Sequence, residues 1–269
     1  MSIRYTKGHG TQNDFVLLPD LDDRALSADL VRALCDRRAG LGADGVLRVS
    51  REGGRWFMDY RNADGSVAEM CGNGVRVFAR YLVDAGLVEP GELAVDTRGG
   101  TKRVWVPPAG PVTVDMGEPE LLDARPVVDG VPGTAVSMGN PHVVVPVNSE
   151  TELTGLDLSG PPEVVPGLPH GQNVEFVLRR GPRALALRVH ERGVGETRSC
   201  GTGVCAAVVA TVTADGQGRD DTWTVDVPGG RLTVRWTAPG PVLLTGPAVL
   251  VARGELSENW LSSVDRDRG

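Results

Sequence analysis

The chain carries the same pattern twice, and this pattern limits how it can fold. Residues 62–82 read NADGSVAEMCGNGVRVFARYL, and residues 192–212 read RGVGETRSCGTGVCAAVVATV. In each stretch a polar lead-in precedes a cysteine, a Gly-x-Gly step and a long apolar run. The two cysteines, Cys71 and Cys200, are 129 residues apart in a chain of 269. This spacing is close to half the chain length, which indicates a duplicated domain.

Both apolar runs are predicted to be helices that must be buried. In the first run, an apolar stripe at i, i+3, i+4 and i+7 is formed by Val75, Phe78, Ala79 and Leu82. The second run, VCAAVVATV, is apolar nearly all round and needs protein on every side. Short strand-like segments flank both helices, so a sheet wrapped about each helix would bury it. The cysteine would then emerge at the N-terminal end of the helix.

The first half is predicted to contain many short strands around its helix. A short opening strand is expected to end near Leu18, and a helix is expected from Ser27 to Arg38 with Ser27 as its cap. Residues 44–62 read as two strands around a Glu-Gly-Gly turn, and residues 91–117 give three more.

The second half repeats this order of strands around one helix. We place the boundary near Gly117 to Arg125, where the strand pattern lapses. The expected N-terminal half is residues 1–117, and the expected C-terminal half is residues 118–254. The C-terminal tail, about residues 255–269, could return to the first half.

Composition excludes several classes of function. The net charge of -7 and the absence of a basic cluster argue against binding to nucleic acid. The N-terminus does not resemble a signal peptide and no apolar run reaches membrane-spanning length, so we expect a cytoplasmic protein without a membrane partner. Only Lys7 and Lys102 could form a Schiff base, so we expect no pyridoxal phosphate cofactor. No pair of the four cysteines has the C-x-x-C spacing of a zinc site, so we expect no metal.

A cysteine at the start of a helix has a chemical use. The free amides of the first turn and the positive end of the helix dipole favour a thiolate, and they can also hold a carboxylate. One such cysteine would be weak evidence for a nucleophile. Two of them, flanking one carbon, could remove a proton from one face and return a proton on the other. The repeat therefore predicts a two-base racemase or epimerase that needs no cofactor.

Five motifs, in order along nearly the whole chain, resemble those of the diaminopimelate epimerase family. They are GHGTQNDFV, NADGSVAEMCGNG, SMGNPH, GQNVEFV and HERGVGETRSCGTG. The resemblance implies an α/β (α+β) fold of two pseudo-symmetric domains, each a mostly antiparallel sheet or barrel around a central helix. It also implies the interconversion of LL- and meso-2,6-diaminopimelate on the route to lysine and peptidoglycan.

The resemblance carries site roles onto matching residues. It implies that Cys71 and Cys200 face each other as the two bases, with Cys200 as proton acceptor and Cys71 as donor for the LL substrate. Support for these bases is implied for His142 and Glu191. The carboxylate at the reacting carbon would be held by the amides of Gly72, Asn73, Gly201 and Thr202. The distal end of the substrate would be bound by Asn62, Asn140, Asn173, Glu191 and Arg192, with Asn13 as a further binding position.

The chain departs from the family pattern at two positions. Gly45 stands where the family often has a glutamine that contacts substrate, and Ala252 stands where members often have an aromatic residue in dimer contacts. The first departure bears on the substrate, and the second bears on the homodimer that the family would suggest.

Two other functions stay open at this point. One is an epimerase or racemase of the same superfamily that acts on another amino acid. The other is a non-catalytic homologue that binds an amino acid. Both cysteines retain their glycine steps, which favours catalysis because binding alone requires no thiol.

Overall fold

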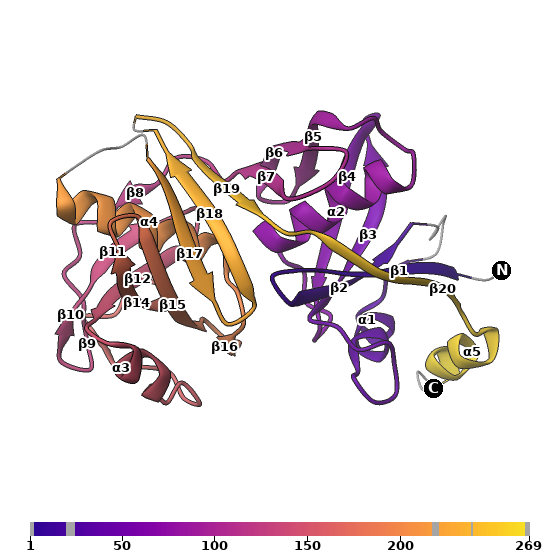
Figure 1. The fold of residues 1–269 in the computed structure, drawn as a ribbon. Helices are drawn as coiled ribbons and strands as arrows, with labels where there is room; N and C mark the ends of the chain where they lie inside the picture. The colour runs from indigo at the N-terminus through magenta and orange to yellow at the C-terminus, as the bar shows by residue number, and fades with distance from the viewer. Residues whose placement is uncertain (1–2, 20–24, 217–220, 238, 267–269) are drawn as a thin grey trace. The chain divides into compact units, whose positions relative to one another are not determined.

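The computed structural model describes residues 3–19, 25–216, 221–237 and 239–266. The chain divides into two compact units (Figure 1). Unit 1 consists of Met1–Val112 and Pro247–Gly269, and unit 2 of Thr113–Gly246. Each unit combines a sheet with one long helix, which confirms the predicted α+β class.

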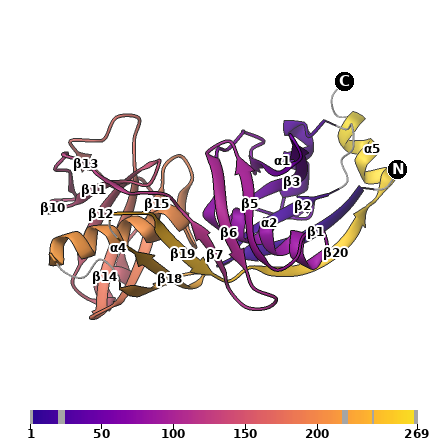
Figure 2. The same cartoon turned by 90° about the horizontal axis from the view of Figure 1, so that it is seen from above.

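In unit 1 the sheet wraps around helix α2 (Gly72–Asp84). The order of its strands is β20 (Val249–Leu256), β1 (Ile3–Gly10), β2 (Asn13–Leu18), β3 (Gly45–Glu52), β4 (Arg55–Asn62), β5 (Gly91–Thr97) and β6 (Gly100–Val106). The pairs β2–β3 and β4–β5 are parallel, and the other pairs are antiparallel. Helix α2 contacts every one of these strands, and Figure 2 shows it from above.

The predicted apolar stripe of α2 is confirmed. Val75, Phe78, Ala79 and Leu82 are fully buried. The burial also extends to a charged residue of the same helix, Arg76, which has no exposed surface. Its guanidinium donates to the carbonyl oxygens of Gly72 (3.1 Å) and Pro247 (3.3 Å), and these bonds offset the cost of removing it from water.

Two shorter helices cover the outer side of the unit 1 sheet. Helix α1 (Ala28–Cys35) and helix α5 (Glu258–Arg266) contact each other, and their apolar residues share one cluster with β1, β2 and β3. Ser27 caps α1, as predicted, by accepting a hydrogen bond from the Leu30 amide. The helix ends at Cys35 and not at Arg38, because the Asp36 carboxylate accepts from the amides of Arg38 (2.7 Å) and Ala39 (2.6 Å). These local bonds compete with the helical ones.

The opening of the chain is a hairpin and not the single strand expected. Strands β1 and β2 pair from Thr6 opposite Leu17 to Gly10 opposite Asn13. Thr11 and Gln12 form the two-residue turn, with positive φ values of 49° and 62°. Such turns favour Asn, Asp and Gly. Thr11 and Gln12 are not typical of them, so the sequence did not indicate a turn at this place. The turn places Asn13 at the start of β2.

Unit 2 repeats the topology of unit 1 around helix α4 (Gly201–Asp215). Its strands run in the order β8 (Glu120–Leu121), β11 (Thr134–Ser137), β12 (Pro141–Val147), β14 (Asn173–Gly181), β15 (Ala184–Glu191), β17 (Thr222–Val227), β18 (Gly230–Trp236), β19 (Val242–Gly246) and β7 (Val112–Asp115). The parallel pairs β12–β14 and β15–β17 occupy the places of β2–β3 and β4–β5. The two units are therefore pseudo-symmetric.

The remaining elements of unit 2 lie beside this sheet. Strand β16 (Gly195–Thr197) pairs with β15, and a small separate sheet contains β10 (Val131–Pro132), β9 (Val127–Val128) and β13 (Val164–Val165). The short helix α3 (Glu150–Gly155) begins at Ser149, whose hydroxyl accepts from the Glu152 amide (3.1 Å). Helices α3 and α5 were not expected from the sequence.

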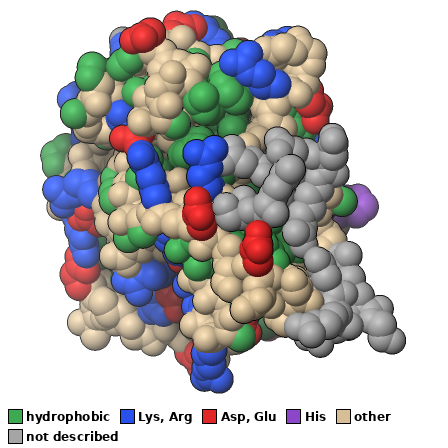
Figure 3. Space-filling view, turned by 90° about the vertical axis from the view of Figure 1, so that its right-hand side faces the viewer, with side chains coloured by type: hydrophobic (Ala, Val, Ile, Leu, Met, Phe, Trp, Pro, Cys, Tyr) green, Lys and Arg blue, Asp and Glu red, His purple; other side chains and the backbone are tan. Residues whose placement is uncertain are grey.

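Two observations bear on the functions that composition excludes, which are binding to nucleic acid and association with a membrane. On the face of the molecule drawn in Figure 3, basic and acidic side chains are interspersed. In the described part of the chain, no helix combines the length and the apolar character needed to cross a bilayer. The exclusion of nucleic acid stays a prediction.

Burial of α2 gives a direct test of the fold. We expect Leu82→Ala to lower the free energy of unfolding by about 2–5 kcal/mol, because Leu82 is fully buried against the sheet. Leu87→Ala is the matched control, since Leu87 is 43% exposed just beyond the helix. Urea unfolding followed by circular dichroism would measure both, and equal losses would contradict the wrapped arrangement.

Candidate active site

Cys71 caps the helix of unit 1. Its backbone is extended (φ -142°, ψ 120°), and its sulfur accepts a hydrogen bond from the Gly74 amide at 3.4 Å. Helix α2 begins directly after it, so Gly72 and Asn73 contribute the first amides of the turn. A first turn of this kind can stabilise an anion next to the sulfur.

Two asparagines predicted to bind substrate lie against Cys71. The Cys71 thiol donates to Oδ1 of Asn13 (3.5 Å), and the side-chain amide of Asn73 donates to the same oxygen (3.2 Å). Asn73 is buried, whereas Asn13 and Cys71 are half-buried. The sequence motifs that contain Asn13 and Cys71 are 58 residues apart and meet because β2 packs on α2.

Asn62 lies in a turn at the end of β4. Its side chain donates to Oγ of Ser66 (3.0 Å), and its carbonyl accepts from the Gly65 amide (2.9 Å). Gly45 lies opposite Asn62 in the β3–β4 pair. A Cβ atom at Gly45 would lie 2.5 Å from the Arg61 carbonyl oxygen and 2.7 Å from the Tyr60 ring. A glutamine at this position would therefore require β4 to shift.

Cys200 occupies the equivalent cap position in unit 2. Its backbone is extended (φ -114°, ψ 113°), and its sulfur lies 3.4 Å from Oγ1 of Thr202. Burial, followed by the negative charges of Glu191 and Glu175, raises the pKa of the Cys200 thiol well above its usual value. A helix N-terminus stabilises an adjacent anion by about 0.3–1 kcal/mol, which is less than the ~1.4 kcal/mol that corresponds to one pKa unit. The helix dipole alone therefore does not make Cys200 a thiolate.

A hydrogen-bonded group of polar residues surrounds the start of α4. Asn140 donates to Thr202 Oγ1 (3.4 Å), and its Oδ1 lies 3.0 Å from Nε2 of His142. The other ring nitrogen of His142 lies 2.7 Å from Oε1 of Glu175, and both side chains are fully buried. Among the described residues, Oε2 of Glu175 has no hydrogen-bond partner. A buried carboxyl oxygen without a hydrogen-bond partner is costly, so its position beside His142 needs an explanation beyond packing.

Glu191 and Asn173 complete this group from the neighbouring strands. Burial of the carboxyl group raises the pKa of Glu191, and hydrogen bonds from Thr197 and Cys200 act in the opposite direction. Asn173 is buried, donates to the Pro141 carbonyl (3.0 Å) and accepts from the Arg192 amide (3.0 Å). The side chain of Arg192 is exposed and donates to the His170 carbonyl (2.8 Å).

The other two cysteines are buried away from these caps. Burial raises the pKa of Cys35 to about 12, and Cys205 lies on the fully buried surface of α4. Within the described residues, no group of three or more His, Cys, Asp or Glu side chains is placed to hold a metal ion.

Sequence reasoning missed several residues that shape the site. Glu175 supports His142, and Asp44 and Arg76 bond the asparagines beside Cys71. Glu175 lies inside the motif GQNVEFV and Asp44 directly precedes Gly45, so both lie next to positions that the sequence had already singled out. Their partners come from other strands, which the sequence does not pair.

Comparison with known proteins decides the family. The sequence pattern of the family described as diaminopimelate epimerase matches residues 5–122 and 134–251. The chain belongs to the diaminopimelate epimerase family. It is 53% identical to the diaminopimelate epimerase of Streptomyces coelicolor, over 97% of this chain and 98% of that protein. It is 50% identical to the diaminopimelate epimerase of Thermobifida fusca, over 94% of this chain and 98% of that protein.

Solved structures agree on the fold of this diaminopimelate epimerase family member. A Bacillus anthracis phenazine biosynthesis protein of the PhzF family superposes with a TM-score of 0.75, over 96% of this chain and 99% of that one. Its identity is 17%, so the likeness concerns the fold alone.

The two cap regions offer a matched pair of glycines. A Cβ atom at Gly203 would lie 2.4 Å from Oε1 of Glu175, whereas one at Gly74 would meet its neighbours at 3.4 Å or more. We therefore expect Gly203→Ala to lower the free energy of unfolding by about 1–3 kcal/mol. Gly74→Ala should change it by less than about 1 kcal/mol, because Gly74 lies in a helix and alanine is the better helix former. Urea unfolding would measure both, and an equal loss would contradict the contact between α4 and Glu175.

Proposed function

We propose that this protein interconverts LL- and meso-2,6-diaminopimelate without a cofactor, supplying precursors of lysine and peptidoglycan in the cytoplasm. The observation that carries the proposal is the cysteine cap repeated at the start of both buried helices, in a member of the diaminopimelate epimerase family. The relatives that are 53% and 50% identical to this chain are both named diaminopimelate epimerase, which supports diaminopimelate as the substrate over other amino acids.

The proposed reaction uses the two cysteines in opposite protonation states. For the LL substrate, the Cys200 thiolate takes the α-proton, and the electrons of the C–H bond pass to the α-carbon and its carboxylate. The Cys71 thiol then donates its proton to the opposite face, which inverts the centre and leaves Cys71 as a thiolate. The amides of Gly72, Asn73, Gly201 and Thr202 would hold the carboxylate as its negative charge grows.

Cys200 needs a proton acceptor before it can act as a base. We propose that Glu191 accepts the thiol proton, because its carboxyl group is close enough to Cys200 for each to shift the pKa of the other, and burial makes Glu191 a stronger base than an exposed glutamate. The resulting thiolate would face the Thr202 hydroxyl, 3.4 Å away. In this proposal His142 supports the site by holding Asn140 and Glu175 through its two ring nitrogens.

The distal amino-acid end of the substrate requires acceptors for its ammonium group and donors for its carboxylate. Arg192 has an exposed guanidinium that could bind the distal carboxylate through two parallel hydrogen bonds. The amide oxygens of Asn62, Asn140 and Asn173, with Glu191, would bind the ammonium group. Gly45 contributes no side chain, so these groups must suffice for recognition.

A homodimer is part of this proposal. Ala252, in place of the family's aromatic residue, is exposed on β20, which pairs with β1 at Lys7. A dimer formed through β20 would therefore use other apolar side chains, such as Val251, which is 61% exposed.

Deuterium incorporation tests the proposed activity. Incubation with LL-diaminopimelate in deuterated water should give meso product that carries deuterium at the inverted α-carbon, with no cofactor added. Mass spectrometry and chiral separation would detect it. Absence of both exchange and inversion would overturn the proposal. The same measurement on other amino acids would then distinguish an epimerase of another amino acid from a non-catalytic amino-acid-binding protein.

Single-cysteine variants test the division of roles. Both Cys71→Ala and Cys200→Ala should lower the rate of inversion at least ~100-fold, because each removes one proton-transfer group. In Cys71→Ala, the LL substrate should still exchange its α-hydrogen without inversion, because Cys200 remains. Cys200→Ala should show this behaviour with the meso substrate. Cys35→Ala is the control, and exchange in the reverse pattern would show that the roles are interchanged.

A further inference from the structure

The hydrogen-bond chain beside Cys71 has a fixed direction. It runs from Arg76 through Asn73 and Asn13 to Asp44. An asparagine side chain can turn either its oxygen or its NH₂ group toward a neighbour, so its orientation depends on what its partners can donate or accept. The two charged groups at the ends of this chain leave one choice.

The Arg76 end determines how Asn73 is oriented. A guanidinium can only donate, and Nη2 of Arg76 donates to Oδ1 of Asn73 at 2.6 Å. The Thr11 hydroxyl donates to the same oxygen at 3.2 Å. The NH₂ group of Asn73 must therefore point the other way, toward Oδ1 of Asn13.

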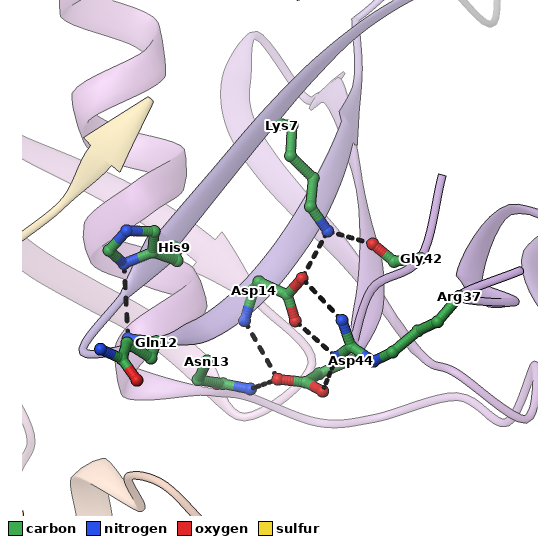
Figure 4. A network of polar contacts seen from close by, with 8 residues as sticks. All are labelled: Lys7, His9, Gln12, Asn13, Asp14, Arg37, Gly42 and Asp44. Carbon is green, nitrogen blue, oxygen red and sulfur yellow. Dashed lines mark hydrogen bonds and ion pairs between the residues drawn. The ribbon is translucent and has the colours of Figure 1, made fainter. Parts of the chain in front are cut away.

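The Asp44 end determines how Asn13 is oriented (Figure 4). A carboxylate can only accept, and Oδ2 of Asp44 accepts from the NH₂ group of Asn13 at 2.8 Å. Oδ1 of Asn13 consequently points at the Cys71 thiol, 3.5 Å away. Asp44 therefore holds the Asn13 oxygen beside the Cys71 sulfur, although Asp44 makes none of these bonds to Cys71 itself.

Asp44 is itself held in place from two sides. Its Oδ2 accepts from the Asp14 amide (3.0 Å), and its Oδ1 pairs with Arg37 (2.7 Å). Arg37 also pairs with the Asp14 carboxylate, as does Lys7 (Figure 4). Partial burial raises the pKa of Asp14, but bonds from Arg37 and Lys7 outweigh it and lower the pKa to about 2. The Asp14 carboxylate therefore remains charged throughout the neutral range.

We propose that Asp44 is a positioning residue for Cys71, acting through Asn13. By holding the Asn13 NH₂ group, Asp44 keeps a carbonyl oxygen against the thiol. A hydrogen-bond acceptor favours the thiol over the thiolate, because a thiolate has no proton to donate. Asp44 thereby favours the protonated form of Cys71 against the opposing effect of the Gly74 amide, and the protonated form is the state that a proton donor needs. This inference rests on the proposed role of Cys71.

A double-mutant cycle on Cys71 alkylation tests the inference. Iodoacetamide reacts with the thiolate, so its rate at Cys71, measured on the isolated peptide by mass spectrometry at about pH 7.5, reports the thiolate fraction. Asp44→Ala should raise this rate about threefold or more in the otherwise unchanged protein, and by less than about 1.5-fold in the Asn13→Ala background. A merely structural effect of Asp44 would be the same in both backgrounds.

Asp14→Ala is the matched control, because Asp14 shares Arg37 with Asp44, while Figure 4 draws no hydrogen bond between the Asp14 side chain and Asn13. It should change the alkylation rate less than about twofold. An equal response of Asp14→Ala and Asp44→Ala, or an equal Asp44→Ala factor in the two backgrounds, would overturn the inference. So would an unchanged rate in Asp44→Ala.

A second variant distinguishes an effect on Cys71 from a failure to fold, and the assay itself does not depend on the proposed activity. If Asp44→Ala does not fold, Asp44→Asn carries the same cycle, because it replaces the charged acceptor that holds the Asn13 NH₂ group with a neutral amide. A rise of about twofold is then expected, and its absence overturns the inference. Alkylation needs no substrate. Failure of deuterium exchange in the unchanged protein would therefore overturn the proposed function while the cycle remained readable.

Discussion

The structure of each unit depends on the burial of one helix inside its sheet. Helices α2 and α4 contact strands along their length, and most of their side chains are removed from water. This burial contributes hydrophobic stabilisation to each unit and leaves the first turn as the polar end of the helix. A cysteine precedes that turn in both units, so the packing of the core and the placement of the candidate bases have the same cause.

The two caps are alike in backbone and different in charge. Cys71 lies beside an amide oxygen whose direction depends on Arg76 and Asp44, in a network that is neutral next to the sulfur. Cys200 lies near Glu191 and Glu175, whose negative charges add to the effect of burial on its pKa. Pseudo-symmetry therefore supplies two similar helix starts, and the unlike side chains around them give the two sulfurs different electrostatic surroundings.

Much of the fold could be predicted because it rests on local patterns. The stripe of α2, the apolar α4, the Ser27 cap and the strands around each helix follow from periodicity and capping. The hairpin at Thr11 was missed because its turn lacks the usual residues, and α1 ended early because Asp36 competes for backbone amides. Glu175 and Asp44 were missed because their importance depends on partners from distant strands.

The sequence by itself determined that the chain is a duplication with a cysteine and glycine step at the start of each buried helix, because these features are local and repeat. The motifs also determined the family, through residue types in a fixed order. Only the tertiary structure decided which side chains surround each sulfur. Asn13, Asp44 and Arg76 in unit 1, and Asn140, Glu175 and Glu191 in unit 2, meet only through strand pairing and the packing of strands on the helix. Hydrogen-bond direction and burial act over a few ångströms, and sequence distance does not encode such proximity.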